Sequence, residues 1–403
     1  MERKEEELKE LRFVGTSAGT ICVGKICDEC IYNSGKFSVF GKQPSACCFD
    51  ETEKCFDGNP YYIFTARDKN KVSIFSKFRV PFDMPKVGAK ERKILKQDIK
   101  SAVKNLEALE NGILQARYGT TEEKSFYDIE NILFYNIGTA NFKKSAKNGV
   151  TFSRVEKQEM NALRKKYNIP DEYEHYYEYA ITQTHQAQEF PSLLAEWRSI
   201  SLKGVGLTAT TSWKNFKENE KAIQLYDKID CNEKDTFSLV LEIEKPKNLR
   251  FNIMTAMKPL LDGLICAFHS SQFSKNELVY FAQKLNCNEE FLTSERIEIL
   301  GERKSKFVQE YRNGVKFNPA DDLCDYVFIT VKEGERWAIS GKIYSSVKCP
   351  HCGRRKLGKL VWGMSAFDEE MKNAERAGRI KFAGCDIPEN KSRYYCKWCK
   401  KEF

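Results

Sequence analysis

Cys349-Pro350-His351-Cys352 and Cys396-Lys397-Trp398-Cys399 are the two stretches that determine the structure at the end of this 403-residue chain. Each is a Cys-x-x-Cys pair, or knuckle, the spacing with which one tight turn supplies two thiolates to a tetrahedral zinc ion. Four buried cysteines without a metal are the alternative. Two such pairs in one short segment predict a zinc ribbon, with these ligands: Cys349, Cys352, Cys396 and Cys399.

The segment between the two knuckles is longer than a simple ribbon needs, and an inserted helix explains its length. Ser365 is the expected N-cap of this helix and Gly378 its C-cap, with apolar residues at helical spacing between them. Cys385, in the same segment, is either a free buried thiol or a replacement for one of the four ligands.

Positive charge is concentrated in the same part of the chain. The last 63 residues contain 15 Lys and Arg against 7 Asp and Glu, so they hold +8 of the net charge of +9. A ribbon this basic favours binding to the phosphates of nucleic acid, DNA or RNA, and aromatic side chains beside it favour stacking on bases. The residues expected to contact nucleic acid are Arg354, Arg355, Lys356, Lys359, Arg393, Lys397 and Trp398.

This tail is similar to a zinc ribbon at the end of many uncharacterised bacterial proteins. The similarity rests on Cys-Pro-x-Cys-Gly, Trp362-Gly363, the stretch 374–378, Gly384-Cys385 and the closing Tyr395-Cys396-x-x-Cys399. It covers only the tail and implies a zinc site, without implying an activity. The character of similar bacterial chains leads us to expect a role in phage defence or DNA processing.

Composition sets wide limits on the rest of the protein. Hydrophobic residues make up 41% of the chain and charged residues 31%, as in an ordinary globular protein. No run of apolar residues is long enough to cross a membrane, and the first residues lack the apolar segment of a signal peptide. We therefore expect a cytoplasmic protein with no membrane partner, whose 15 cysteines are reduced thiols and metal ligands.

Residues 1–85 are rich in cysteine and read as a β-containing subdomain. A second zinc site is one interpretation of these cysteines, and an iron–sulfur cluster, suggested by the spacing Cys22-x4-Cys27-x2-Cys30, is another. Simple buried thiols are the third. The ligands expected for a second metal are Cys27, Cys30, Cys47 and Cys48, with Cys55 as a further candidate.

Proline and glycine just after residue 80 mark a domain boundary. We expect a multidomain α+β protein with the Cys-rich part at 1–85, a mixed α/β central domain at 86–345 and the basic zinc ribbon at 346–403. No internal repeat is visible in the sequence. In the central domain, residue periodicity predicts one long amphipathic helix over 90–116. It also predicts helices over 189–197, 259–269 and 275–285, and strands over 237–243 and 326–331.

Carboxylates in the central domain form a candidate catalytic site. Asp262 lies in the first turn of a helix that begins at Lys258-Pro259, and Asp321-Asp322 precede the strand predicted over 326–331. A strand, such a helix and a later acidic pair occur in the same order in the RusA-like Holliday-junction resolvases, whose clustered aspartates bind magnesium.

The resemblance to these resolvases is partial. Leu260 stands where the family has its first aspartate, and Gly263 stands where it has asparagine, so only Asp262 and one of Asp321 and Asp322 match. It implies cleavage of phosphodiester bonds with magnesium, which takes carboxylate ligands. The alternative is that these aspartates only cap a helix and a turn.

Two classes of function follow. One is a zinc-containing nucleic-acid-binding protein whose central region either cleaves the strand with magnesium, with Asp262, Asp321 and Asp322 as catalytic candidates, or holds a partner. The other is a non-enzymatic scaffold component that binds a protein partner in a complex and uses the ribbon only to stabilise its fold.

Overall fold

The computed structural model describes most of the chain. The described residues are 11–14, 61–66, 69–81, 89–107, 109–122, 127–183, 192–202, 207–231, 234–294, 296–302, 306–363, 369–388 and 391–403. Helices and strands are mixed along this part of the chain, as expected for an α+β protein. No described helix is long and apolar enough to cross a membrane. The cysteines proposed as a second metal site, Cys27, Cys30, Cys47, Cys48 and Cys55, lie outside the described residues.

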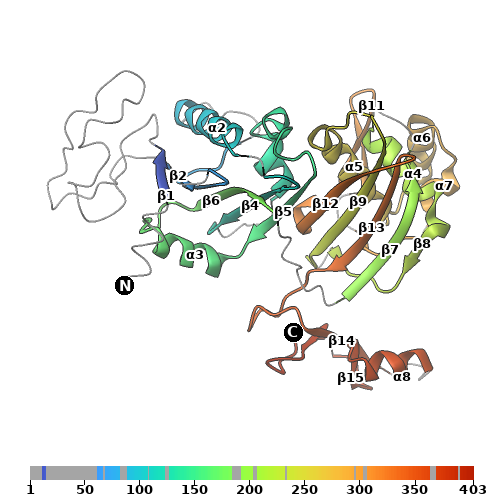
Figure 1. The fold of residues 1–403 in the computed structure, drawn as a ribbon. Coiled ribbons are helices and arrows are strands. Elements are labelled where there is room, and N and C mark those ends of the chain that lie inside the picture. Colours follow the sequence, from blue (N-terminus) through green and yellow to red (C-terminus); the bar gives the residue numbers. More distant parts are fainter. Residues whose placement is uncertain are drawn as a thin grey trace, which may run out of the picture.

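One large sheet runs through the body of the protein (Figure 1). Its eleven strands are, in spatial order, β1 (Leu11–Val14), β2 (Tyr61–Ala66), β3 (Lys71–Ser76), β6 (His175–Thr182), β4 (Ile113–Thr120), β5 (Gly149–Val155), β12 (Cys324–Gly334), β9 (Phe237–Pro246), β13 (Ala338–Ser345), β7 (Ser192–Ser201) and β8 (Ile223–Leu225). The β4–β5 and β9–β12 pairs are parallel, and the neighbours β5 and β12, at the middle of the sheet, are antiparallel.

The sheet consists of two halves with the same topology. In chain order, the first half is β3, helix α2 (Ala89–Lys104), β4, short helices η2 (Asn131–Tyr135) and η3 (Thr139–Phe142), β5 and β6. The second half is β7, helix α4 (Ala209–Glu218), β9, helix α5 (Ile253–Ala267), β12 and β13. From the middle of the sheet outward, the strands of the first half are β5, β4, β6 and β3, and those of the second half are β12, β9, β13 and β7. In both halves these are the third, second, fourth and first strands in chain order. The protein therefore contains an internal structural repeat, which the sequence does not show because different side chains encode the two copies.

The second half carries an insertion between α5 and β12. It comprises helices α6 (Lys275–Leu285) and α7 (Glu289–Thr293), the hairpin β10 (Val308–Tyr311) and β11 (Gly314–Phe317), and the short helix η6 (Asp321–Leu323). A further short helix, η4 (Glu220–Ala222), precedes β8. Helix α3 (Lys157–Lys166) follows β5 in the first half. The helix expected over 275–285 is confirmed as α6.

Two expectations about the first half are wrong. The helix expected over 90–116 ends at Lys104, and β4 begins at Ile113. Asn111, with φ +57°, turns the chain between them. The boundary expected at residue 85 does not separate strands 61–76 from the central region, because β3 pairs with β6 over its whole length.

The helix expected over 189–197 is also wrong, because this segment contains the start of strand β7. Strand β7 pairs with β13 on one side and β8 on the other, and Leu194, Ala195 and Trp197 are buried, so its neighbours decide its structure. The strands expected over 237–243 and 326–331 are confirmed as parts of β9 and β12. The helix expected over 259–269 lies largely within α5, but its expected start at Lys258-Pro259 is wrong. Helix α5 begins at Ile253, so Pro259 is inside the helix and Asp262 is not in its first turn.

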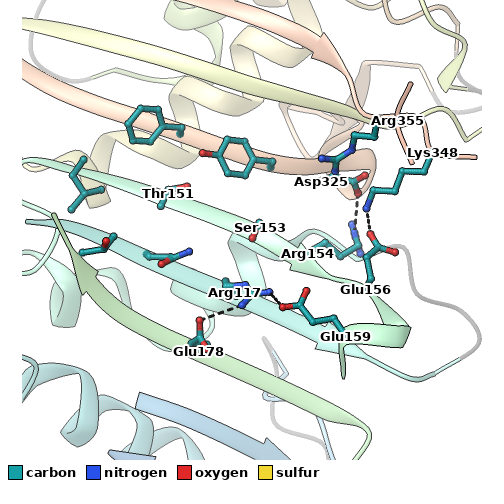
Figure 2. A pocket seen from close by; sticks show the side chains of 15 residues that line it. Arg117, Thr151, Ser153, Arg154, Glu156, Glu159, Glu178, Asp325, Lys348 and Arg355 are labelled. Atoms are coloured by element: carbon teal, nitrogen blue, oxygen red, sulfur yellow. Dashed lines mark hydrogen bonds and ion pairs between the residues drawn. The ribbon is translucent and has the colours of Figure 1, made fainter. Parts of the chain in front are cut away.

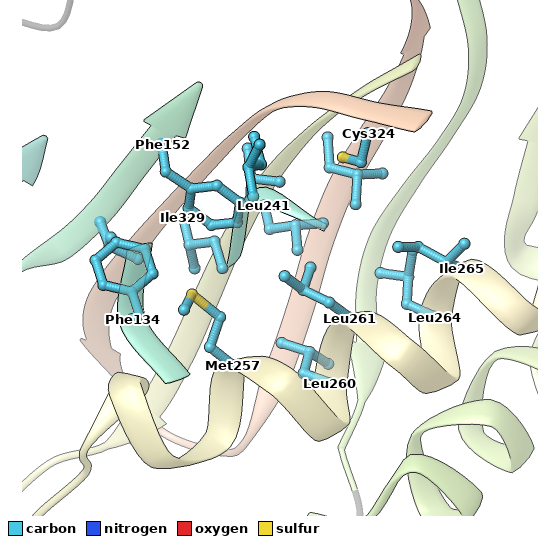
Figure 3. Packing of buried hydrophobic residues seen from close by; sticks show 14 of the residues in the cluster. Phe134, Phe152, Leu241, Met257, Leu260, Leu261, Leu264, Ile265, Cys324 and Ile329 are labelled. Carbon is cyan, nitrogen blue, oxygen red and sulfur yellow. The ribbon is translucent and has the colours of Figure 1, made fainter. Parts of the chain in front are cut away.

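The main core lies between the sheet and the helices on one of its faces. Met257, Leu261 and Leu264 of α5 point toward Leu241 of β9 and the strand β12, and Phe152 of β5 joins the same cluster (Figure 3). The core thus continues across the boundary between the two halves. Fully burying side chains of this size stabilises a fold by about 1.5–3 kcal/mol each, so α5 is firmly held.

Gly263 allows α5 to lie against α4. A Cβ atom at this position would lie 2.3 Å from the Ala209 carbonyl oxygen. A residue with a side chain at this position would therefore force α4 and α5 apart.

The ribbon forms a separate three-stranded sheet at the end of the chain. Its strands are β15 (Ile380–Gly384), β14 (Leu357–Trp362) and β16 (Tyr394–Cys396), in this spatial order. Helix α8 (Glu369–Arg376) lies between the knuckles, as expected, and Gly378, with φ +67°, follows its end. The expected N-cap Ser365 lies outside the described residues.

Candidate functional site

The four predicted zinc ligands come together at the base of the ribbon. Their Sγ atoms all lie within 4.8 Å of one another. Cys349 Sγ is 3.5 Å from Cys399 Sγ, and Cys352 Sγ is 3.5 Å from Cys396 Sγ. Sulfur atoms bound to one tetrahedral zinc ion lie about 3.8 Å apart, so this spacing suits the ion. The four thiols therefore form a group that can hold a metal ion.

The two knuckles share one backbone geometry. The Gly353 N–H donates to the Cys349 carbonyl at 2.8 Å, and the Lys400 N–H donates to the Cys396 carbonyl at 2.9 Å. Both donors have positive φ, +69° and +62°, which turns the chain back after each pair.

The environment of Cys396 favours the thiolate. Burial raises the pKa of this thiol, but hydrogen bonds from the backbone of Cys399 and Trp398 outweigh burial and lower the pKa to about 6. The thiolate is the form that binds a metal. Cys385 is exposed and lies outside this group, so it is a free thiol at the surface and not a fifth ligand.

Ion pairs hold the inner side of the ribbon against the body of the protein. Arg393 pairs with Asp235 through two contacts, and the Tyr394 hydroxyl donates to Asp235 at 2.8 Å. Lys359 pairs with Asp227. Two of the residues expected to bind nucleic acid, Lys359 and Arg393, are thus bound to carboxylates of the same chain.

The other residues of that set divide into two groups. Arg354, Lys356, Lys397 and Trp398 are exposed on the outer side of the ribbon. The Arg354 guanidinium lies over the Trp398 ring, 3.5 Å from its centre. Arg355 instead reaches back toward the central sheet, where it lines a cavity together with Asp325.

A second cluster of charged side chains lies between the two halves of the sheet, on the helix-covered face. Lys258 of α5 is at its centre. Its Nζ atom is 2.8 Å from carboxylate oxygens of Asp128 and Asp321, 3.0 Å from Asp262 and 3.6 Å from Glu130. Lys258 and Asp262 are four residues apart, so they lie on the same face of α5. We call these five residues the Lys258 cluster.

The carboxyl groups of the Lys258 cluster are too many for its one ammonium. Glu130 is 4% exposed, and neither of its oxygens has a hydrogen-bond partner among the described residues. Burial, with the charges of Asp128, Asp262 and Asp321, raises the pKa of Glu130 to about 8, although Lys258 opposes this shift. The cluster therefore holds a carboxyl group that binds a proton at neutral pH.

The pKa values of Asp128 and Asp321 shift in opposite directions. Burial and the charge of Asp128 raise the pKa of Asp321 well above its usual value. For Asp128, burial is outweighed by Lys258 and by the hydrogen bond with Asp321, so its pKa is lowered. Burial also raises the pKa of Asp262, with Lys258 opposing it. Lys258 Nζ lies between these carboxyls, and among the described residues only the four cysteines form a group close enough together to hold a metal ion without rearrangement.

Arg154, near the end of β5, ties together the two loops that carry Asp128 and Asp321. Its Nη2 atom donates to the Tyr127 carbonyl at 3.1 Å and to the Asp322 carbonyl at 2.8 Å. Its Nε atom donates to Asp325 Oδ1 at 3.1 Å. One side chain of the first half thus positions acidic residues from both halves.

The structure separates the three predicted catalytic aspartates. Asp262 and Asp321 both contact Lys258, whereas Asp322 does not line the cavity that these residues surround. Sequence reasoning missed Asp128, Glu130 and the central position of Lys258. The signal that could have revealed Asp128 and Glu130 is the stretch Asp128-Ile129-Glu130. It follows strand β4 and precedes the short helix η2, and in the repeated topology this segment corresponds to the α5 region of the second half.

Substituting Glu130 tests the protonation of the Lys258 cluster. A carboxyl with a raised pKa in the folded state costs stability as pH rises from its unfolded value, about 4.3, through its folded value of about 8. Glu130→Gln, always neutral, is therefore expected to match the wild type near pH 4.5 and to be roughly 3–5 kcal/mol more stable above pH 8.

Urea unfolding at both pH values, with EDTA present, measures this difference. Glu277→Gln is the matched control, because the pKa of the exposed Glu277 is lowered to about 2 by hydrogen bonds from Lys306 and Ser274. A pH-independent effect of Glu130→Gln would show that Glu130 is ionised throughout.

Comparison of the whole chain with protein-family models, with curated proteins and with solved structures found no match.

Proposed function

We propose that this protein binds nucleic acid and cleaves phosphodiester bonds with magnesium at the Lys258 cluster. Asp128, Asp262 and Asp321 are the residues that would hold the metal, in the place that Lys258 Nζ occupies in this structure. A resemblance of the α5 region to the RusA-like resolvases supports the same chemistry. Zinc in the ribbon has a structural role in this proposal, because all four of its ligands come from the protein.

One observation carries the proposal, namely the buried excess of carboxyl groups around Lys258. Among the described residues Glu130 has no hydrogen bond, and four carboxyls face a single ammonium. One carboxylate is enough to neutralise a buried lysine, and the extra acids cost stability unless a cation or protons neutralise them. A divalent metal ion would neutralise these acids at neutral pH.

The cluster reaches solvent on one side. The side chains of Asp262, Asp321 and Lys258 are 19%, 22% and 23% exposed, whereas Glu130 is buried. When bound, magnesium would polarise a phosphate and lower the pKa of a water nucleophile. Lys258 would then offer its ammonium to the negative charge that develops on the phosphate oxygens.

Cleavage assays with the full chain test the activity. Labelled single-stranded and double-stranded DNA and RNA are incubated with magnesium or with EDTA, and products are expected only with magnesium. Intact substrates under both conditions would favour the scaffold role, in which the ribbon only stabilises the fold.

Binding of nucleic acid is proposed for the outer side of the ribbon, where Arg354 and Lys356 have no partner carboxylate among the described residues. The double variant Arg354→Gln, Lys356→Gln is expected to weaken the binding of nucleic acids of unrelated sequence to a similar extent. It should also reduce the slope of log affinity against log salt by about 0.7–0.9 for each phosphate that the protein no longer neutralises.

Titrations of labelled oligonucleotides at two salt concentrations measure this slope. Lys359→Gln is the matched control, because Lys359 is already paired with Asp227, and it should leave the slope unchanged. An unchanged slope in the Arg354 and Lys356 double variant would remove the outer side of the ribbon from the proposal. Equal affinities of the intact chain and a chain without residues 346–403 would support the scaffold role.

A further inference from the structure

A polar groove lies on the face of the sheet opposite the Lys258 cluster (Figure 2). Side chains alternate between faces along a strand, so Phe152 of β5 lines the Lys258 cavity while its neighbours Thr151 and Ser153 line the groove. The groove has a volume of about 520 Å³. This is within the range of sites for small molecules, about 300–1,000 Å³.

The floor of the groove consists of two rows of side chains across three strands. Gln115 of β4, Thr151 of β5 and Phe328 of β12 are direct neighbours in one row. The next row contains Arg117, Ser153 and Tyr326. Each row therefore offers hydrogen-bonding groups beside an aromatic ring, which suits a ligand that has both a flat ring and polar substituents.

The wall of the groove is charged, and its basic side chains are paired with one exception. Arg117 contacts Glu159 and Glu178, Arg154 contacts Asp325, and Lys348 contacts Glu156 (Figure 2).

Arg355 is the exception among the described residues that line the groove. It comes from the first knuckle of the ribbon, and within the described part of the chain its Nε atom is buried without a hydrogen-bond partner. Burial lowers its pKa, although Asp325 and Glu156 oppose this. The Nε–H group of Arg355 therefore lacks an acceptor, which an oxygen of a bound anion could supply.

We propose that this groove binds a nucleoside phosphate, with the phosphate on Arg355 and the base and sugar over the floor formed by β5 and β12. The bound unit is either a free mononucleotide or one nucleotide of a strand. The proposal does not depend on cleavage at the Lys258 cluster, because the two sites lie on opposite faces of the sheet.

Calorimetric titration of the full chain in EDTA tests the groove. The ligands are the four ribonucleoside monophosphates, adenosine without phosphate, and a 5′-phosphorylated trinucleotide. Arg355→Gln is expected to weaken binding of phosphate-bearing ligands at least about tenfold and to leave adenosine unaffected. Arg376→Gln, on helix α8 and outside the lining of the groove, is the control and should change mononucleotide affinity less than about twofold.

A second variant covers the case in which Arg355→Gln disturbs the ribbon, which zinc content would reveal. Phe328→Ala is expected to weaken binding of every base-containing ligand roughly fivefold or more, because it removes base stacking. Mononucleotide binding identifies a free nucleotide as the ligand, and binding of the trinucleotide alone identifies a strand. Absence of both, or equal affinities of wild type, Arg355→Gln and Phe328→Ala, overturns the proposal.

Discussion

Asp262→Asn is expected to reduce magnesium-dependent cleavage by about a thousandfold, the largest effect on activity that the Lys258 cluster predicts. The amide keeps the size of the side chain but removes one of the charges that would hold the metal. Cleavage rates at saturating magnesium, measured on the substrate that the wild type cuts best, give the effect. Magnesium titration should also show weaker metal binding.

Folding should survive this substitution. The carboxyl of Asp262 is partly buried and its pKa is raised, so a neutral amide is expected to leave the metal-free protein as stable as the wild type at neutral pH, or more stable. Thermal unfolding in EDTA checks this point.

The matched control is Asp322→Asn. Asp322 is next to Asp321 in sequence, but it does not line the cavity around Lys258, and its hydrogen bond with Arg154 uses the backbone carbonyl. It should therefore keep most of the activity. Full activity in Asp262→Asn, or equal reductions in the two variants, would contradict a metal site at this cluster.

Cys396→Ser is expected to remove one zinc per chain and to unfold the ribbon. Structural zinc sites contribute about 10–16 kcal/mol of apparent binding free energy at neutral pH, far more than the small sheet of β14, β15 and β16 can replace. Elemental analysis gives the zinc content, and limited proteolysis shows whether the chain after residue 346 has unfolded.

Cys385→Ser is the control for this experiment. Cys385 is exposed and lies outside the group of four thiols, so its substitution should change neither zinc content nor protease resistance. The expected result is a zinc content lower by one ion per chain in Cys396→Ser than in the wild type, so any metal bound elsewhere does not affect the comparison. Unchanged zinc in Cys396→Ser would show that the four thiols are not the metal site.

Unfolding of the ribbon should also free the acidic residues to which it binds. Asp235 and Asp227 pair with Arg393 and Lys359 of the ribbon, and both pairs break when the ribbon unfolds. A weaker affinity of Cys396→Ser for nucleic acid could therefore come from unfolding of the ribbon or from loss of its charges. The Arg354 and Lys356 double variant separates the two causes, because it removes charges and keeps the ribbon docked.

The repeated topology explains why the Lys258 cluster is a composite site. Asp128 and Glu130 come from the first half, and Lys258, Asp262 and Asp321 come from the second. Strands β5 and β12 meet at the middle of the sheet, so the loops and helices next to them meet on the same face. The arrangement gives one cluster from two copies of the same fold.

Features that depend on local spacing could be predicted from the order of residues alone. Two Cys-x-x-Cys pairs are sufficient to predict the ribbon and the group of four thiols, because each knuckle is a turn of a few residues. The periodicity of apolar residues predicted α6, β9, β12 and most of α5 for the same reason. Asp262 and Asp321 could be selected as carboxylates that flank a helix and a strand.

The side chains that meet in the Lys258 cluster could not be predicted in this way. Asp128 and Lys258 are 130 residues apart in sequence, and they meet because β5 pairs with β12. The segments 113–116 and 192–197 became strands because neighbouring strands bury and hydrogen-bond them, an influence that outweighs local helical spacing. Lys359 and Arg393 are docking residues instead of free cations because Asp227 and Asp235 lie opposite them. Long-range pairing of strands and charges is a property of the folded chain, and no local pattern of residues encodes it.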